Sequence, residues 1–429
     1  MRFSPQSQTI QRCAACGTEL SELDARSRCD CGGLLEALEP RPSLSGKALR
    51  ALFGARRANA QGVLASGVWR YRELVAPGAT DAEIVSHPEG KTPLLVRPAV
   101  TRFAGVENLA MKHEGQNPTG SFKDRGMTAG VTQARRVGAS AVACASTGNT
   151  SASLAAYAAQ AGIPALVVVP AGNIALGKLA QSLAYGAKTL LVRGDFDACL
   201  ALVEQASREL DVYLLNSINP FRLEGQKTIV LELLEQLSWQ PPDWIALPAG
   251  NLGNTSAFGK ALAEARELGL VDRLPRLAAI QAAGASPFAQ GFAEGFRERR
   301  RMKAETVATA IKIGDPASWD RAVKAIAETN GVATAVTDAE ILEAKAAIDA
   351  SGVGCEPASA ASIAGVRKLV REGTIRPTES VVAVLTGHVL KDPGILIAYH
   401  RDTDPPPPGA NRPIEIDADL RAVERALRG

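Results

Sequence analysis

The sequence predicts an α/β protein in which the strands of a parallel sheet alternate with helices. Six short apolar runs have the length of strands and two segments between them have helical spacing: strands at 140–145, 165–169, 189–192, 244–247, 277–281 and 381–385, helices at 151–160 and 197–210. Strands that alternate with helices are typical of βαβ units and parallel sheet. Several of these strands are followed by glycine and small polar residues, and open α/β sheets bind ligands at that edge.

The composition is that of a globular protein with an aliphatic core. A chain of 429 residues is long enough for two or three domains, and its 46% hydrophobic and 22% charged residues are ordinary values. Aromatic residues make up only 4%. The 48 basic and 45 acidic residues leave a net charge of +3, which argues against a nucleic-acid partner. Only four histidines are present, which argues against a histidine-rich metal centre.

The two ends of the chain carry no targeting or membrane signal. No apolar run approaches the roughly 20 residues of a membrane span, and the first residues lack the apolar core of a secretory signal. We therefore expect a soluble cytoplasmic protein without a membrane partner. Near the other end, residues 404–413 form a proline-rich linker, and Ile416, Leu420, Val423 and Leu427 recur at helical spacing. This pattern predicts a short C-terminal helix.

Four of the seven cysteines fall within a predicted ribbon at residues 1–40. Cys13 and Cys16 have zinc-knuckle spacing, whereas Cys29 and Cys31 are separated by one residue instead of two. Four thiolates in such a segment can form one tetrahedral zinc site, which would be structural because no coordination position stays open. The alternative is a ribbon that holds no metal, or four free thiols.

A lysine stands at the start of a predicted helix in the segment 117–126. Pro118 and Gly120 interrupt regular structure, and Ser121 is a suitable N-cap. Lys123 then lies in the first turn, where the helix dipole disfavours a cation and lowers the pKa of the amine. A neutral amine is the form that attacks a carbonyl to form a Schiff base. For this motif alone, the alternative is an ordinary exposed lysine.

Two glycine-containing loops, 146–151 and 248–255, each follow a predicted strand and precede a helix. Backbone N–H groups at a helix N-terminus suit an anion, and Gly250 and Gly253 allow a ligand to approach closely. The second loop lacks the G-x-G-x-x-G pattern and is therefore a poor dinucleotide site. Thr386 ends the last predicted strand with a hydroxyl that can donate or accept one hydrogen bond. The alternatives are a capped helix and a turn.

Taken together and in this order, the motifs resemble the pyridoxal-phosphate enzymes of the tryptophan-synthase-β type, and within them the threonine synthases. The resemblance extends from about residue 87 to residue 393. It rests on N-P-T-G-S-F-K-D-R at 117–125, S-T-G-N-T-S at 146–151 and G-N-L-G-N at 250–254. Two more segments, 216–228 and 306–314, are similar to threonine synthases in particular.

The resemblance implies a fold and a domain organisation. Enzymes of this type, called fold type II, contain two open twisted sheets flanked by helices. The large α/β domain is then formed by residues 41–124 and 223–429, and the small α/β domain by residues 125–222. The family also implies a homodimer.

The resemblance further implies roles for individual residues. Lys123 is the catalytic residue, which binds the cofactor covalently and removes the Cα proton of the substrate. The implied cofactor-binding residues are Phe122, Asn149, Gly250, Asn251, Leu252, Gly253, Asn254 and Thr386. The implied substrate-binding residues are Ser146, Thr147, Lys178, Ser217 and Arg222. An arginine fork with a nearby lysine suits a phosphate dianion.

The implied reaction converts O-phospho-L-homoserine and water to L-threonine and phosphate with pyridoxal 5'-phosphate as cofactor. Cysteate synthase, which uses phosphoserine and sulfite, shares the lysine and both phosphate sites and is one alternative. The other is a catalytically silent relative that only binds a ligand. The intact Lys123, Asn149 and 250–254 loop argue against that last possibility.

Overall fold

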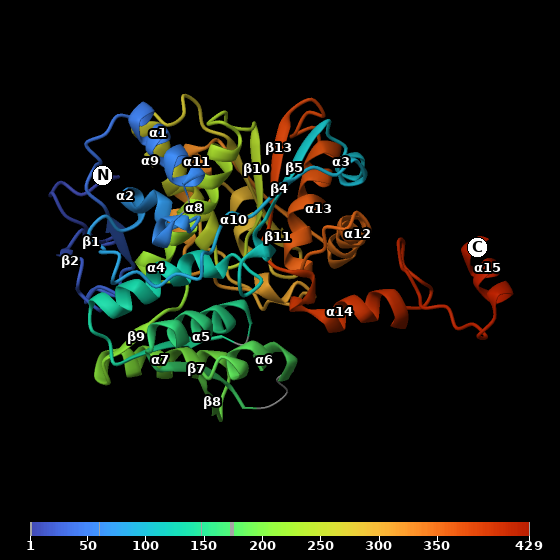
Figure 1. The fold of residues 1–429 in the computed structure, drawn as a ribbon, viewed down its shortest axis with the longest axis horizontal. Coiled ribbons are helices and arrows are strands. Elements are labelled where there is room, and N and C mark those ends of the chain that lie inside the picture. Colours follow the sequence, from blue (N-terminus) through green and yellow to red (C-terminus); the bar gives the residue numbers. More distant parts are fainter. Residues whose placement is uncertain (1, 60, 147, 172–175, 429) are drawn as a thin grey trace.

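The computed structural model describes residues 2–59, 61–146, 148–171 and 176–428. It contains a six-stranded sheet, a four-stranded sheet and a small three-stranded sheet at the N-terminus (Figure 1). The small sheet has the order β2-β1-β3 and is antiparallel, with strands β1 (Ile10–Cys13), β2 (Glu19–Ser21) and β3 (Leu35–Leu38). The predicted α/β class, with two helix-flanked sheets and an N-terminal ribbon, is therefore confirmed.

The six-stranded sheet has the order β12-β11-β10-β13-β5-β4 and is parallel except for β4. Its strands are β4 (Leu94–Leu95), β5 (Asn108–His113), β10 (Trp244–Pro248), β11 (Arg276–Ala282), β12 (Val332–Val336) and β13 (Ser380–Leu385). The central strand β10 is buried on both faces, because Ile245 and Leu247 pack in one apolar cluster and Trp244 and Ala246 in another. A parallel sheet buried on both faces explains the continuous apolar runs in the sequence.

Helices cover both faces of this sheet. One apolar cluster joins the sheet to α8 (Pro220–Gln236), α9 (Gly253–Glu267) and α11 (Trp319–Glu328). The opposite cluster joins it to α3 (Pro98–Ala104), α12 (Asp338–Ala350) and α13 (Pro357–Arg371). The remaining helices of this part are α1 (Gly46–Ala58), α2 (Arg72–Val75), α10 (Pro287–Ala293) and α14 (Pro393–Ile397). Within the described residues, no helix is long and apolar enough to cross a membrane.

The four-stranded sheet is entirely parallel, with the order β8-β7-β6-β9. Its strands are β6 (Ala141–Ala145), β7 (Ala165–Pro170), β8 (Lys188–Val192) and β9 (Val212–Leu214). Helices α4 (Lys123–Arg136) and α5 (Asn149–Ala161) pack on one face, and α7 (Phe196–Glu209) packs on the other. Helix α6 (Leu176–Ala184) lies between β7 and β8 in the chain. All four strands lie inside the interval 125–222, whose limits as a domain stay a prediction.

The C-terminal segment extends away from the sheets (Figure 1). The predicted linker at 404–413 contains no regular element, and a helix, α15 (Leu420–Arg428), follows it. Leu420, Val423 and Leu427 of this helix are exposed, and Ile416 precedes the helix.

A buried network of charges connects the start of α4 to β5 and α8. The Arg125 guanidinium lies 2.7 Å from a Glu114 oxygen and 2.8 Å from a Glu232 oxygen. Glu232 also pairs with Lys112 at 2.6 Å and with Arg70 at 2.5 Å. Because these side chains are buried, Glu232 is a counter-charge shared by three cations, and Lys112 has no other carboxylate partner among the described ion pairs.

Removing the Glu232 charge is therefore expected to destabilise the fold. Glu232→Gln should lower the free energy of unfolding by about 3–5 kcal/mol, because buried cations lose their partner. Urea denaturation followed by circular dichroism measures the change. The control Glu107→Gln alters an exposed carboxylate and should stay within about 0.5 kcal/mol of the parent chain. Equal stability of the two variants would show that the network does not need this charge.

Candidate active site

The loop before α4 is held against the end of β13. The Phe122 N–H donates to the Thr386 carbonyl at 3.0 Å, and the His388 N–H donates to the Gly120 carbonyl at 2.9 Å. Ser121 forms an isolated β-bridge with Gly387 between these two bonds. The first residue of α4, Lys123, is thus fixed at the carboxyl edge of the six-stranded sheet, where ligands bind in open α/β folds.

Ser121 does not occupy the predicted N-cap position. The helix begins at Lys123 with Phe122 as its flanking residue, because Ser121 is already paired with Gly387. The Ser121 hydroxyl still accepts a hydrogen bond from the Lys123 N–H at 3.4 Å. The predicted cap is therefore wrong by one residue.

The Lys123 amine has the electrostatic environment of a nucleophile. Burial and the positive charge of Arg222 lower the pKa of Lys123 to about 7, whereas the Glu356 carboxylate raises it. Its Nζ lies 4.1 Å from the centre of the Phe122 ring. The predicted direction of the shift is the one found, but its causes are desolvation and Arg222 instead of the helix dipole. Near neutral pH, a large fraction of this amine is unprotonated.

Arg222 reaches the site because α4 and α8 cross closely. A Cβ on Gly225 would lie 1.8 Å from the Arg125 carbonyl oxygen, and one on Gly130 would lie 3.0 Å from the Arg222 Cγ. Larger side chains at these two positions would push the helices apart. The sequence thus uses glycine to place an arginine of α8 beside the first turn of α4.

The Arg222 guanidinium is buried and only partly hydrogen-bonded. Its Nη1 donates to the Leu215 carbonyl at 2.9 Å, whereas Nε and Nη2 have no partner among the described residues. Burial lowers the pKa of Arg222 to about 10, which leaves it charged at neutral pH. A buried charged donor without an acceptor is costly, so this geometry suits an anionic ligand.

A glutamate that the motifs did not reveal links two predicted cofactor-binding residues. The Asn149 side-chain amide donates to Glu356 Oε2 at 2.9 Å, and the Thr386 hydroxyl donates to Glu356 Oε1 at 3.1 Å. Ser359 adds a third anchor, since its Oγ lies 2.9 Å from the Thr386 Oγ1. An amide nitrogen has two hydrogens, so Asn149 keeps one for a ligand while Glu356 fixes its orientation.

Glu356 is packed so closely against Gly387 that only glycine fits at position 387. A Cβ on Gly387 would lie 2.4–2.6 Å from the Glu356 carboxyl group. Burial raises the pKa of Glu356. In the sequence, the available signal was a single acidic residue before Pro357, at the start of a run of alanines and serines.

Replacing Glu356 by glutamine removes the negative charge and keeps the shape of the side chain. In Glu356→Gln the amide can accept from Asn149 and donate to Thr386, so both contacts persist. Lys123 loses a nearby negative charge, and its pKa is expected to fall. The pH dependence of cofactor uptake by the cofactor-free protein measures this, and the midpoint should move to lower pH. A midpoint equal to that of the parent chain would show that Glu356 does not act on Lys123.

The loop 250–254 has the geometry of an anion-binding loop. Leu252 has a left-handed backbone with φ of 63°, directly before the first residue of α9. A Cβ on Gly250 would lie 2.9 Å from the Ile311 Cα, so this position requires glycine. The Asn254 Oδ1 and the Thr255 Oγ1 are buried and have no partner among the described residues. A 15-residue helix begins at Gly253, and the unpaired backbone N–H groups of its first turn suit an anion.

This loop is tied to the predicted substrate-binding segment. The Asn251 amide donates to the Ser217 hydroxyl, and its Oδ1 accepts from the Ala317 N–H at 2.6 Å. Ser217 thereby adjoins the loop. Ser146 lies at the end of β6, and its hydroxyl accepts from the Gly148 N–H at 3.3 Å.

For two of the predicted site residues, the structure describes no side chain. Thr147 lies outside the described residues, and Lys178 lies in α6, with only its backbone described. The other predicted site residues fit pyridoxal phosphate, because they provide an amine with a lowered pKa, an amide, a hydroxyl and a helix N-terminus for the phosphate. Their individual roles stay predictions.

The four N-terminal cysteines come together as predicted. Their sulfur atoms all lie within 4.8 Å of one another, with 3.5 Å between Cys13 and Cys31 and 3.6 Å between Cys16 and Cys29. A tetrahedral zinc site with bonds of about 2.3 Å requires sulfur atoms about 3.8 Å apart. The C-x-C spacing of the second pair therefore does not prevent a four-cysteine site.

Known proteins resemble this chain over nearly its whole length. Residues 85–387 match the family described as pyridoxal-phosphate dependent enzyme. The threonine synthase of Methanocaldococcus jannaschii is 45% identical over 421 residues, covering 98% of this chain and 99% of that enzyme. The threonine synthase of Synechocystis is 48% identical over 336 residues, covering 76% and 85%.

Solved structures show the same fold at lower sequence identity. The crystal structure of threonine synthase from Escherichia coli has a TM-score of 0.70 and 19% identity, and the match covers 98% of this chain and 99% of that one. The resemblance inferred from the motifs is confirmed by the sequence matches. The chain belongs to the threonine synthase family of pyridoxal-phosphate-dependent enzymes.

Proposed function

We propose that this chain converts O-phospho-L-homoserine and water to L-threonine and phosphate. The observation that carries the proposal is the Arg222 guanidinium, which is buried near Lys123 with two nitrogens free of partners among the described residues. It supplies a second anion site beside the glycine-rich loop. A substrate that carries its own phosphate needs two such sites, one for the cofactor and one for itself.

Each residue of the site has a separate role in the proposed reaction. Pyridoxal phosphate, when bound, supplies the electron sink that makes the Cα–H bond of an amino acid acidic. Lys123 would hold the cofactor through its Nζ, and its neutral amine is the group that would accept the Cα proton of the substrate. Asn149 and Thr386, oriented by Glu356, position the cofactor ring. Loop 250–254 binds the cofactor phosphate.

Arg222 and Ser217 bind the substrate phosphate in this proposal. That phosphate would depart from Cγ after a Cβ proton is lost. Cγ then takes up a proton and becomes the methyl group, water adds its hydroxyl at Cβ, and a proton returns to Cα. A planar guanidinium donates two parallel hydrogen bonds to phosphate oxygens, which orients the leaving group as well as binding it. Arg222 and Glu356 are thus given roles by their contacts.

The substrate assay separates this proposal from its nearest alternative. Purified holoenzyme is given O-phospho-L-homoserine, or O-phospho-L-serine with sulfite, and phosphate release is measured. We expect release with the first substrate and a background rate with the second. The reverse result would assign cysteate synthase activity instead, and release from neither would refute a phosphorylated substrate.

We also propose that Cys13, Cys16, Cys29 and Cys31 hold one structural zinc ion. The sulfur–sulfur distances near the tetrahedral value support this, and four thiolates leave no position for a substrate. We expect one zinc per purified chain by elemental analysis. Cys29→Ser should lose the metal and melt at a lower temperature, because zinc binding contributes to folding. The control Cys199→Ser, outside the ribbon, should keep its zinc; a metal-free parent chain would refute the site.

A further inference from the structure

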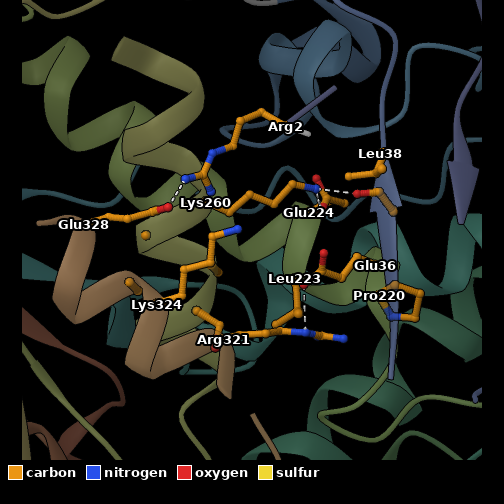
Figure 2. A pocket seen from close by; sticks show the side chains of 15 residues that line it. Arg2, Glu36, Leu38, Pro220, Leu223, Glu224, Lys260, Arg321, Lys324 and Glu328 are labelled. Carbon is orange, nitrogen blue, oxygen red and sulfur yellow. Dashed lines mark hydrogen bonds and ion pairs between the residues drawn. The ribbon is translucent and has the colours of Figure 1, made fainter. Parts of the chain in front are cut away.

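A cavity outside the active site lies between the N-terminal ribbon and the helices of the six-stranded sheet. It has a volume of about 70 Å³, and Figure 2 shows the side chains that line it. They come from Arg2 near the N-terminus, from β3 and from α8, α9 and α11. None of the described active-site residues lines this cavity.

Next to this cavity, two lysines pair with a group of buried glutamates. Lys227 and Lys260 lie within 4 Å of three carboxylates: Glu39, Glu224 and Glu264. Burial and the neighbouring Glu39 raise the pKa of Glu224 to about 8. Burial and Glu39 thus favour the protonated form of Glu224, and both lysines have carboxylate partners within this group.

At the mouth of the cavity, one cation forms no ion pair with the described residues. Arg2 pairs with Glu328, and the Arg321 Nε lies 3.2 Å from a Glu36 oxygen. Lys324 is exposed and forms no ion pair in the described part of the chain. Figure 2 shows its amino group pointing toward the middle of the labelled side chains.

Arg321 provides an unsatisfied donor next to that charge. Its side chain is only 10% exposed, and its Nη2 donates to the Leu35 carbonyl at 2.8 Å. Its Nη1 is buried and has no partner among the described residues. Because a buried donor of a charged group is costly to leave unpaired, this nitrogen indicates a missing acceptor. Arg321 and Lys324 are one helical turn apart on α11, so one small anion can reach both.

We propose that this cavity binds the carboxylate of a short aliphatic acid between Arg321 and Lys324. A monoanion brings less negative charge than a phosphate dianion into a cavity whose lining already contains the carboxylates of Glu36 and Glu328. The walls beside the charges include Leu38, Leu223 and Ala325, which suit a short hydrocarbon chain. A cavity of this volume holds roughly five water molecules, which is comparable to a molecule of six heavy atoms.

The position of the cavity connects it to the active site through two helices. Leu223 and Glu224 line it, and the preceding residue of α8 is Arg222. Ser256 and Lys260 line it from α9, whose first residue, Gly253, belongs to the anion-binding loop. A ligand in this cavity therefore contacts the two helices that carry both phosphate-binding groups. The site itself does not depend on the proposed reaction.

Ligand-observed saturation-transfer NMR on the holoenzyme tests the proposal with isobutyrate as the probe. Isobutyrate has no amine and cannot react with the cofactor. We expect saturable binding at one site per chain, and binding at least about tenfold weaker for the uncharged isostere isobutyramide. L-Valine distinguishes the source of the carboxylate. If L-valine binds more tightly than isobutyrate and the visible absorption of the cofactor is unchanged, the ligand is an amino acid. If L-valine binds more weakly, the ligand is a simple acid.

Variants of Lys324 assign the binding to this cavity instead of to Arg222. Lys324→Met should weaken isobutyrate binding about tenfold, and Lys324→Arg should restore it, because the charge returns. The matched control Lys47→Met, at another exposed lysine, should leave the Kd unchanged. No saturation with isobutyrate, equal binding of isobutyramide, or an unchanged Kd in Lys324→Met would overturn the proposal.

Discussion

Lys123→Ala is expected to abolish both the covalent attachment of pyridoxal phosphate and turnover. Lys123 is the buried amine whose pKa is lowered to about 7 at the start of α4, so its removal takes away both the nucleophile and the base. The loss of rate should be at least about a thousandfold. Borohydride reduction followed by mass spectrometry measures attachment, and the mass added to the parent chain should be missing from the variant. Lys303→Ala, at an exposed lysine, serves as the control.

The lowered pKa of Lys123 adds a pH dependence to this expectation. The lysine is neutral above a pKa of about 7 and protonated below it, and only the neutral amine attacks the cofactor aldehyde. Cofactor uptake by the cofactor-free protein should therefore accelerate as pH rises through about 7 and level off above pH 8. A rate that keeps rising toward pH 10 would show an ordinary lysine, and full activity of Lys123→Ala would refute its role.

Arg222→Ala should weaken both the binding and the conversion of the substrate without displacing the cofactor. Loss of charge-assisted hydrogen bonds worth about 1.5–3 kcal/mol corresponds to roughly 10- to 150-fold in kcat/KM for O-phospho-L-homoserine. Because the phosphate is also the leaving group, both a higher KM and a lower kcat are expected. The visible absorption of the bound cofactor should remain.

Arg222→Lys is the matched control, since it keeps the charge and loses the planar fork. It should recover KM in part and kcat less, because orientation of the phosphate depends on the fork. Activity of Arg222→Ala equal to that of the parent chain would remove Arg222 from the substrate site.

Strands could be predicted where burial on both faces leaves a continuous apolar run. The strands β6, β7, β10, β11 and β13 were found this way, within one or two residues of their observed ends. Strand β5 gave no such signal, because it contains Lys112 and His113. The buried Lys112 amine is satisfied by contacts with Glu232, Thr92 and Gln236, which are distant in the sequence. Strand β9 has three residues, too few for a pattern.

The candidate site could be predicted where its groups are close in the sequence. The lysine motif and the two glycine-containing loops each carry a local signal, namely a helix start with small polar residues. Glu356 carries none, because its role arises from contact with Asn149, 207 positions away. The free nitrogens of Arg222 likewise result from the crossing of α4 and α8, which the sequence suggests only through its glycines.

The most direct test of the proposed chemistry is the fate of water oxygen. The holoenzyme is incubated with O-phospho-L-homoserine in water enriched in ¹⁸O, and both products are analysed by mass spectrometry. Addition of water at Cβ predicts one ¹⁸O atom in the hydroxyl group of threonine and none in the released phosphate, because the Cγ–O bond breaks. Labelled phosphate together with homoserine would mean simple hydrolysis of the phosphate ester, and would contradict a pyridoxal-phosphate-dependent elimination and replacement.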